Sequence, residues 1–314
     1  MATPVYLFTG FLDSGKTTLI KDTLSDPNFM EGVSRTLIVC FEQGEEEYEE
    51  DWLNDHHAFI EYVDDVETFT PEKMHELDTI YHPDQVFIEW NGTLAIPESI
   101  ISNMPDFWPL VQILTPVDAS TFATFMGPLR QMMYEQIRYS DTVICNRCTE
   151  ETSGSMLRGN IKAINRRAQI FYEGNFGEAI ELKDGGLPFD INAPIIDIKD
   201  DDYGLWYLDI SDNPEKYDGK TVKVKGMYHK PDNYPKGSFV HGRKAMTCCE
   251  EDISLIGLIC ITQKDLKLKN GDWITITAKV SCRENKQYNE KMAILLEEKV
   301  EKSQEPENTL VSFS

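Results

Sequence analysis

Short apolar segments alternate with helix-like segments over the first 190 residues of the chain. The apolar runs occupy residues 4–9, 35–42, 57–63, 85–90, 109–119 and 141–146. Between them, amphipathic patterns predict helices over residues 16–26, 71–81, 121–140 and 153–168. Apolar strands that alternate with helices are typical of βαβ units around a parallel sheet. We therefore expect an α/β domain with a doubly wound, mostly parallel sheet, whose ligands bind at the carboxyl ends of the strands.

After residue 190 the pattern changes to strand-like runs separated by Gly, Asn and Pro. Five such runs follow one another: GKTVKVKGMYHK, GSFVHGRKAMTCC, SLIGLICIT, GDWITITAKVSC and KMAILLEEKV. This spacing predicts a small antiparallel β-barrel, and five strands favour an OB-like barrel. The predicted organisation is a first domain over 1–190, a Pro- and Asp-rich linker over 191–205, the barrel over 206–300 and a flexible tail over 301–314.

The charge of the chain is unevenly distributed between these parts. The net charge is −24, and residues 1–205 hold 13 basic and 37 acidic side chains, whereas residues 206–300 hold 16 basic and 14 acidic ones. An acidic surface repels the phosphate backbone of nucleic acids. We therefore do not expect the first domain to bind nucleic acid.

Composition places the chain among globular proteins. Hydrophobic residues make up 41% of it, and no apolar run reaches the roughly 18 residues that a membrane span needs. The start, MATPVYLFTG, lacks the pattern of a secretory signal. The seven cysteines are an odd number and lie largely in apolar stretches, which does not suit a disulfide framework. We expect a cytoplasmic protein without a membrane segment.

The segment GFLDSGKT, from Gly10 to Thr17, satisfies the phosphate-binding pattern G-x-x-x-x-G-K-[ST] between a predicted strand and a predicted helix. Glycines allow the tight turn that points backbone N–H groups at phosphate oxygens, and the start of the helix adds partial positive charge. Lys16 supplies a charge to the β- and γ-phosphates, and the Thr17 hydroxyl is a ligand for Mg²⁺. The expected nucleotide contacts are Gly10, Asp13, Ser14, Gly15, Lys16, Thr17 and Thr18.

A second signal lies in DQVFIEWNG, residues 84–92. There an apolar strand ends in an acid, Glu89, and Gly92 follows three residues later. An acid at that strand end can hold the magnesium ion of a bound nucleotide through water, and a glycine N–H can approach the γ-phosphate. We therefore add Glu89 to the expected magnesium site and Gly92 to the nucleotide contacts.

Several segments together resemble the CobW-like branch of P-loop GTPases. They are GFLDSGKTT, FEQGEEE, IEWNGTLAIP, the strand end VDA at 117–119 and EQIRYSDTVICNR at 135–147, and the resemblance covers residues 1 to about 185. It implies GTP and Mg²⁺ as ligands, slow GTP hydrolysis and delivery of a metal, often zinc or cobalt, to a client protein or metalloenzyme. The implied catalytic residues are Lys16, Thr17, Glu89 and an acid of the 42–47 stretch, for which we choose Glu42 as the residue that orients water.

The sequence departs from that family at the base-recognition motif. The family has Asn-Lys-x-Asp after a strand, and this chain has Asn146, Arg147, Cys148 and Thr149. Asn146 keeps its expected place at the nucleotide. A threonine cannot replace the two-point hydrogen bonding of a carboxylate, and such a loss costs roughly 1–3 kcal/mol. The preference for GTP over ATP is therefore left open by the sequence.

A second departure concerns the metal. Many relatives carry Cys-x-Cys-Cys between the phosphate loop and the acid strand, but this chain has no cysteine between Cys40 and Cys145. That interval holds the acidic run EQGEEEYEED and the pair His56–His57. Carboxylates and imidazoles can bind Zn²⁺. The alternative interpretation is that the run is a solvated switch loop.

The second half resembles the C-terminal domain of an uncharacterised bacterial family found alongside a predicted permease and associated with zinc-responsive gene sets. The segments that carry the resemblance are GKTVKVKGMYHK and GRKAMTCCEEDISLIGLIC, and it covers about residues 195–300. Its most specific part is Arg243 with residues 246–249 (Met-Thr-Cys-Cys) and Asp252. Two adjacent thiolates can bind a thiophilic metal, so Cys248 and Cys249 are candidate zinc ligands. A purely structural cysteine pair is the alternative.

Three functions are compatible with these signals. The first is a GTPase that couples its nucleotide state to metal delivery. The second is a non-hydrolysing adaptor, in which a bound nucleotide is structural and the barrel binds a protein partner. The third is a nucleotide-switched binder of single-stranded RNA, which only the near-neutral charge of the second half leaves open.

Overall fold

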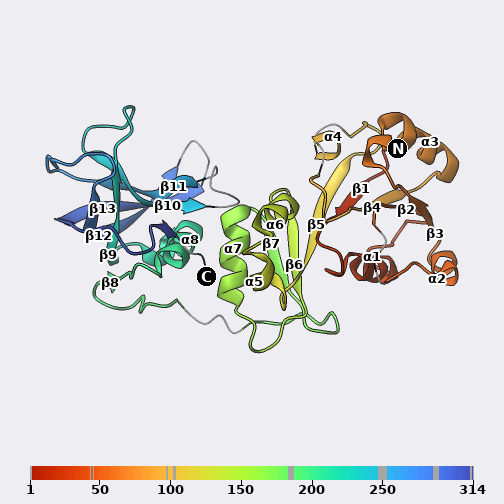
Figure 1. The fold of residues 1–314 in the computed structure, drawn as a ribbon, viewed down its shortest axis with the longest axis horizontal. Coiled ribbons are helices and arrows are strands. Elements are labelled where there is room, and N and C mark those ends of the chain that lie inside the picture. Colours follow the sequence, from red (N-terminus) through yellow and green to blue (C-terminus); the bar gives the residue numbers. More distant parts are fainter. Residues whose placement is uncertain are drawn as a thin grey trace. The chain divides into compact units, whose positions relative to one another are not determined.

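The computed structural model describes residues 2–42, 44, 46–96, 98–101, 104–182, 187–246, 253–285, 290–311 and 313. The chain forms two compact units (Figure 1). The first contains residues 1–152 and 164–182, and the second contains residues 153–163 and 183–314. No helix in the described ranges has the length and apolar character of a membrane span.

The first unit is built on a parallel sheet of seven strands in the order β3-β2-β4-β1-β5-β6-β7. All six neighbouring pairs are parallel, as the alternation of strands and helices predicts. The strands are β1 (Val5–Phe8), β2 (Thr36–Cys40), β3 (Ala58–Tyr62), β4 (Gln85–Glu89), β5 (Leu110–Asp118), β6 (Thr142–Asn146) and β7 (Gln169–Tyr172). The strands β2 and β4 are buried along their whole length, which explains the apolar runs LIVC and VFI within them.

Helices and short turns connect these strands. They are α1 (Lys16–Ser25), α2 (Glu50–Asp55), the 3₁₀ turn η1 (Val66–Thr68), α3 (Pro71–Tyr81), α4 (Glu98–Ile101), α5 (Phe122–Phe125), α6 (Arg130–Ile137) and α7 (Gly154–Ile164). The helix predicted over 71–81 is confirmed, and it begins where the Thr70 side chain accepts a hydrogen bond from the Lys73 N–H. The single helix predicted over 121–140 is wrong. It is two helices, because Gly127 and Pro128 interrupt it.

The sheet of the second unit contains five long strands and two short ones. They are β8 (Ile196–Asp197), β9 (Thr221–His229), β10 (Ser238–Met246), β11 (Ile253–Ile261), β12 (Trp273–Asn285), β13 (Glu290–Lys302) and β14 (Leu310–Val311). The five long strands pair in a closed ring, because β9 pairs with both β12 and β10. The pair β11–β13 is parallel, so the sheet is mixed and the prediction of an antiparallel barrel is wrong in this respect. The OB-like designation stays a prediction.

Residues 191–205, expected as a linker, belong to the second unit. They contain β8 and the start of a helix, α8 (Tyr203–Asp212), which is followed by the 3₁₀ turn η2 (Pro214–Tyr217). Buried side chains of α8, among them Tyr203 and Trp206, share one apolar cluster with Val224 and Ile276 of the ring strands. The segment therefore contributes to the core, since its Ile196, Ile198 and Tyr203 are buried in the same cluster.

Residues 301–314, expected as a flexible tail, also contain ordered structure. Strand β13 continues to Lys302, and β14 pairs in parallel with β10. Phe313 is only 5% exposed and packs with Leu208 and Ala245. The mostly polar composition of the tail predicts an exposed segment, although Phe313 within it is buried.

Candidate nucleotide site

The loop from Gly10 to Thr17 connects the end of β1 to the start of α1. Gly15 precedes the helix with a φ of 100°, in the left-handed region that favours glycine. A Cβ atom at Gly15 would lie 2.7 Å from Nδ2 of Asn146, so the site also has no room for a side chain. The loop therefore has the backbone turn on which the predicted cradle depends.

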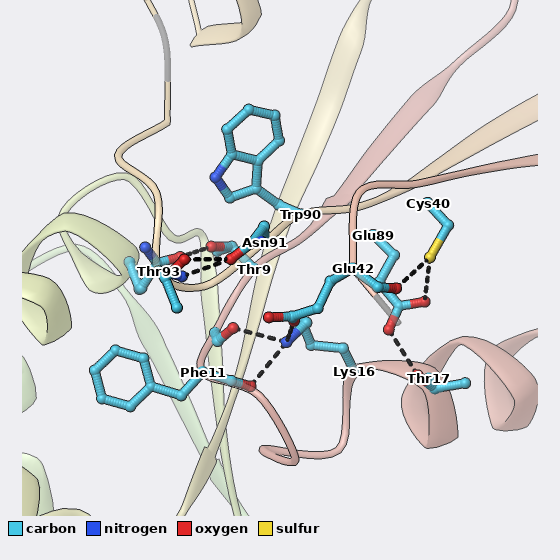
Figure 2. A network of polar contacts seen from close by, with 12 residues as sticks. Thr9, Phe11, Lys16, Thr17, Cys40, Glu42, Glu89, Trp90, Asn91 and Thr93 are labelled. Carbon is cyan, nitrogen blue, oxygen red and sulfur yellow. Dashed lines mark hydrogen bonds and ion pairs between the residues drawn. The ribbon is translucent and has the colours of Figure 1, made fainter. Parts of the chain in front are cut away.

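The ammonium group of Lys16 points back into this loop (Figure 2). Its Nζ donates hydrogen bonds to the carbonyl oxygens of Gly10, at 2.8 Å, and Phe11, at 2.7 Å. It also forms an ion pair of 2.6 Å with the carboxylate of Glu42, which follows β2. Both side chains are almost fully buried, at 3% and 9% exposed. Glu42 is therefore the anionic partner of Lys16 in this conformation.

Glu89, at the end of β4, accepts hydrogen bonds from three side chains. The Thr17 hydroxyl and the Tyr48 hydroxyl each lie 2.6 Å from one of its oxygens, and the Cys40 sulfur lies 3.7 Å away (Figure 2 shows Thr17, Cys40 and Glu89). Burial and the negative charge of Glu89 raise the pKa of Cys40 to about 12, and the same two causes raise the pKa of Tyr48. Thiol and phenol are therefore protonated donors to the Glu89 carboxyl group.

Tyr48 was not singled out from the sequence. It lies in the acidic run EQGEEEYEED, where the one aromatic residue was the available signal. Lys21 of α1 holds this part of the chain: its Nζ is 2.6 Å from the carbonyl oxygen of Glu47 and 3.3 Å from carboxylate oxygens of Glu46 and Glu49. The same ammonium lies 5.9 Å from the centre of the Tyr48 ring. The described part of the acidic run is thus attached to α1.

The described residues contain no group of three or more His, Cys, Asp or Glu side chains arranged to hold a metal. His56, one candidate, stacks on Trp52 with ring centres 4.2 Å apart, and its Nδ1 lies 2.8 Å from the Trp52 carbonyl oxygen. The imidazole is therefore engaged at the end of α2. Glu45, Cys248 and Cys249 lie outside the described residues, so zinc binding there stays a hypothesis.

Gly92 lies directly against the phosphate loop. A Cβ atom at Gly92 would be 1.9 Å from the carbonyl oxygen of Gly10 and 2.7 Å from Cα of Phe11. The two backbones touch with no space for a side chain between them. This close approach requires a glycine at residue 92, whether or not its N–H also reaches a phosphate.

The end of β6 contacts the other side of the loop. The side-chain amide of Asn146 donates a 2.7 Å hydrogen bond to the carbonyl oxygen of Ser14. Nη1 of Arg147 donates to the carbonyl oxygen of Asp13, at 2.9 Å, and to the carboxylate of Asp118, at 2.7 Å. Burial opposes ionisation of Asp118, but hydrogen bonds from Ser120 and Arg147 hold its pKa below the usual value. Strand ends β5 and β6 are thereby tied to the loop.

One solvent-open cavity, with about 870 Å³ of empty space when the adjoining solvent is included, brings most of the predicted residues together. Its lining consists of Leu12, Asp13, Gly15, Lys16, Thr17, Thr18, Glu42, Gly44, Glu46, Glu89 and Arg147. Two buried polar atoms of the adjoining loops, Oγ of Ser14 and Oδ1 of Asn146, have no hydrogen-bond partner among the described residues. Arg147 was not among the predicted contacts, although its place after Asn146 was the available signal.

Comparison with solved structures finds matches at low sequence identity. The hydrogenase maturation factor HypB from Archaeoglobus fulgidus is 20% identical over 55% of this chain and 81% of its own, with a TM-score of 0.39. The Zn(II)-bound YjiA GTPase from E. coli is 18% identical over 74% of this chain and 73% of its own, with a TM-score of 0.44. A Zn(II)-bound triple mutant of the YjiA GTPase is 15% identical over 86% of this chain and 92% of its own, with a TM-score of 0.42.

Two family models match consecutive parts of the sequence, while no curated protein matches the chain. The model of the DUF1980 C-terminal domain matches residues 187–312. The model of the CobW/HypB/UreG nucleotide-binding domain matches residues 4–172, which include the phosphate loop, Glu89 and Asn146. With more than half of its length matched by this second model, the chain belongs to the CobW/HypB/UreG family of nucleotide-binding proteins and carries a DUF1980 C-terminal domain.

Proposed function

We propose that this protein binds and slowly hydrolyses GTP, and that its nucleotide state governs the handling of zinc or cobalt for a client protein. The observation that supports this proposal is the arrangement of Lys16, Thr17 and Glu89 around one cavity. Membership of the nucleotide-binding family supports the same reading. We favour a GTPase over the adaptor, because Lys16, Thr17 and Glu89, which are expected to act on the terminal phosphates, line one cavity.

The cavity suits a nucleoside triphosphate with magnesium. The amides of the Gly10–Thr17 loop and the Lys16 ammonium would hold the phosphates. Thr17 and Glu89 offer the oxygen donors that Mg²⁺ prefers, and their 2.6 Å contact places both at one point of the cavity wall. When bound, magnesium neutralises charge on the β- and γ-phosphates.

Glu42 would have a second role once phosphate oxygens replace it beside Lys16. Released from the ion pair, its carboxylate remains on a wall of the same cavity, where it can accept a hydrogen bond from the attacking water. Arg147, which also lines the cavity, is engaged by Asp13 and Asp118. We therefore do not expect Arg147 to stabilise the negative charge on the transferred phosphoryl group. Hydrolysis should accordingly be slow unless a partner supplies a positive charge.

Phosphate release distinguishes the GTPase from the adaptor. We expect the full chain to release phosphate from GTP in the presence of Mg²⁺, and Lys16→Ala to abolish this release because it removes the phosphate-binding charge. If the wild type retains GTP but releases phosphate no faster than Lys16→Ala does, the nucleotide is structural and the adaptor reading is correct.

Metal handling requires a separate test. Purified wild type and the double variant Cys248→Ser, Cys249→Ser are titrated with Zn²⁺ and Co²⁺, with and without GTP. We expect metal content to fall in the double variant and GTP turnover of the wild type to depend on bound metal. Unchanged metal content and unchanged turnover would remove the metal-delivery part of the proposal and leave the GTPase part intact.

A further inference from the structure

Glu173 directly follows β7, at the edge of the sheet where β6 ends in Asn146. Its backbone N–H donates a 2.8 Å hydrogen bond to the carbonyl oxygen of Cys145, and its carbonyl oxygen accepts a 2.9 Å hydrogen bond from the N–H of Cys148. These two bonds fix Glu173 beside both ends of the Asn146–Arg147 pair. Because that pair contacts the phosphate loop, Glu173 belongs to the same rim of the nucleotide site.

Thr149 does not supply an acceptor for a base. Its backbone N–H is bonded to the Thr152 hydroxyl at 2.8 Å, and its own hydroxyl accepts from the Glu151 N–H at 3.3 Å. The side chain is therefore used within its own turn. A hydroxyl also lacks the second oxygen that two-point recognition of a base edge needs.

The Glu173 carboxylate is half-buried, and it has no hydrogen-bond donor within the described part of the chain. Burial and the carboxylate of Asp22 raise its pKa. Asp22 lies on α1, one helical turn after Thr18, which lines the cavity. The charge of Asp22 thus acts on the Glu173 carboxylate, and a ligand that presents N–H groups would stabilise the charged form of this carboxylate.

We propose that Glu173 recognises the base of the bound nucleotide and selects guanine. This inference rests on the proposed function, because it assumes that the loop from Gly10 to Thr17 holds the phosphates. The guanine edge presents two adjacent donors, N1–H and the 2-amino group, to the two oxygens of a carboxylate. Adenine presents an acceptor, N1, which a carboxylate repels. Glu173 therefore supplies from β7 the group that Thr149 lacks after β6.

Competition against a fluorescent GTP analogue on the full chain tests this assignment, with GTP, ITP, XTP and ATP as competitors. Wild type should prefer GTP over ATP, and over ITP, which lacks the 2-amino group. In Glu173→Gln, GTP affinity should fall by about tenfold to a hundredfold. XTP affinity should rise in the same variant, because an amide N–H can donate to the xanthine 2-carbonyl. A gain of XTP binding is a result that damage to the fold cannot produce.

Two further variants complete the experiment. Glu151→Gln removes an equal charge from an exposed residue of the neighbouring turn, and it should leave the ratio of GTP to XTP affinity unchanged. Glu173→Asp keeps the carboxylate on a shorter side chain, and it should weaken GTP binding while GTP stays preferred over XTP. If the wild type binds GTP through Lys16 while Glu173→Gln leaves the ratio of GTP to XTP affinity unchanged, that result would overturn the role of Glu173 but not the proposed function. Absence of Lys16-dependent binding in the wild type would overturn the proposed function as well.

Discussion

The ammonium group of Lys16 lies 2.6 Å from a carboxylate oxygen of Glu42, and both side chains are almost fully buried. Lys16 is thus already neutralised before any phosphate reaches it. A triphosphate has to compete with this carboxylate for the same charge, and the carboxylate also repels the incoming phosphates. Under the proposed function, nucleotide binding therefore requires displacement of Glu42 from Lys16.

Glu42→Gln should strengthen nucleotide binding and slow hydrolysis. Loss of the competing negative charge is expected to lower the Kd for GTP by about two- to tenfold. Loss of the group that would orient water is expected to lower kcat by about a hundredfold. Equilibrium binding and single-turnover phosphate release measure the two effects separately. Glu46→Gln, an acid of the same cavity that does not contact Lys16, should change neither by more than about twofold.

Glu89→Gln should remove the contribution of magnesium to nucleotide binding. The carboxylate sits against the Thr17 hydroxyl, and only its charged form suits a divalent cation. We expect GTP affinities of the wild type and the variant to agree in EDTA and to differ by about tenfold or more in Mg²⁺. Glu61→Gln, which removes a partly exposed acid that pairs with Lys73, is the matched control. Equal magnesium dependence in both variants would contradict the assignment of Glu89.

Gly92→Ala should destabilise the first unit and impair nucleotide binding. The added Cβ would lie 1.9 Å from the Gly10 carbonyl oxygen, so one backbone has to move. The expected cost is about 3 kcal/mol, or a decrease of about 6–12 °C in the melting temperature of this unit. Gly127→Ala is the control, since a Cβ there meets no atom within 4 Å. Scanning calorimetry and GTP titration are the measurements.

His241 should make the stability of the second unit dependent on pH. Burial, with the nearby Arg243 charge, lowers its pKa from 6.5 to about 4, although its contact with the Ile274 carbonyl opposes the shift. Between these two values the unfolded chain binds more protons than the folded one. The free energy of unfolding should therefore fall as the pH falls from 6.5 to 4, by roughly 3 kcal/mol at most.

Urea titrations at several pH values test this dependence. His241→Gln cannot take up the proton, so the part of the pH dependence that belongs to this imidazole should disappear even if the variant is less stable. His82→Gln, at an exposed histidine, should keep the dependence of the wild type. If the free energy of unfolding depends on pH equally in His241→Gln and in the wild type, the buried imidazole does not control this dependence.

Much of the first unit follows from local sequence. The helix at 71–81 carries its own start signals, Thr70 and Pro71, and the buried strands β2 and β4 are built around the apolar runs LIVC and VFI. Strand β7 was missed because it has only four residues, QIFY, which alternate between exposed and partly buried and follow the polar stretch NRRA. The prediction of one helix over 121–140 followed the apolar pattern and neglected the Gly-Pro pair, which breaks the helix into two.

Other features depend on contacts between residues far apart in sequence. Helix α8 was missed because acidic residues before Tyr203 dominate the composition of that segment. The phosphate loop was predictable because its motif is contiguous. The contacts of Glu89 with Tyr48, and of Arg147 with Asp118, join residues 41 and 29 positions apart, which spacing rules do not address.

The contact between Gly92 and Gly10 has a mechanical consequence. Two main chains that touch without side chains between them cannot slide independently, so the floor of the cavity and the strand end that carries Glu89 act as one stiff block. Arrival and departure of the γ-phosphate can then be transmitted only by parts that are attached through side chains. Glu42 and Tyr48 are such parts, and both follow β2, so under the proposed function these two residues would be the ones that respond to the nucleotide.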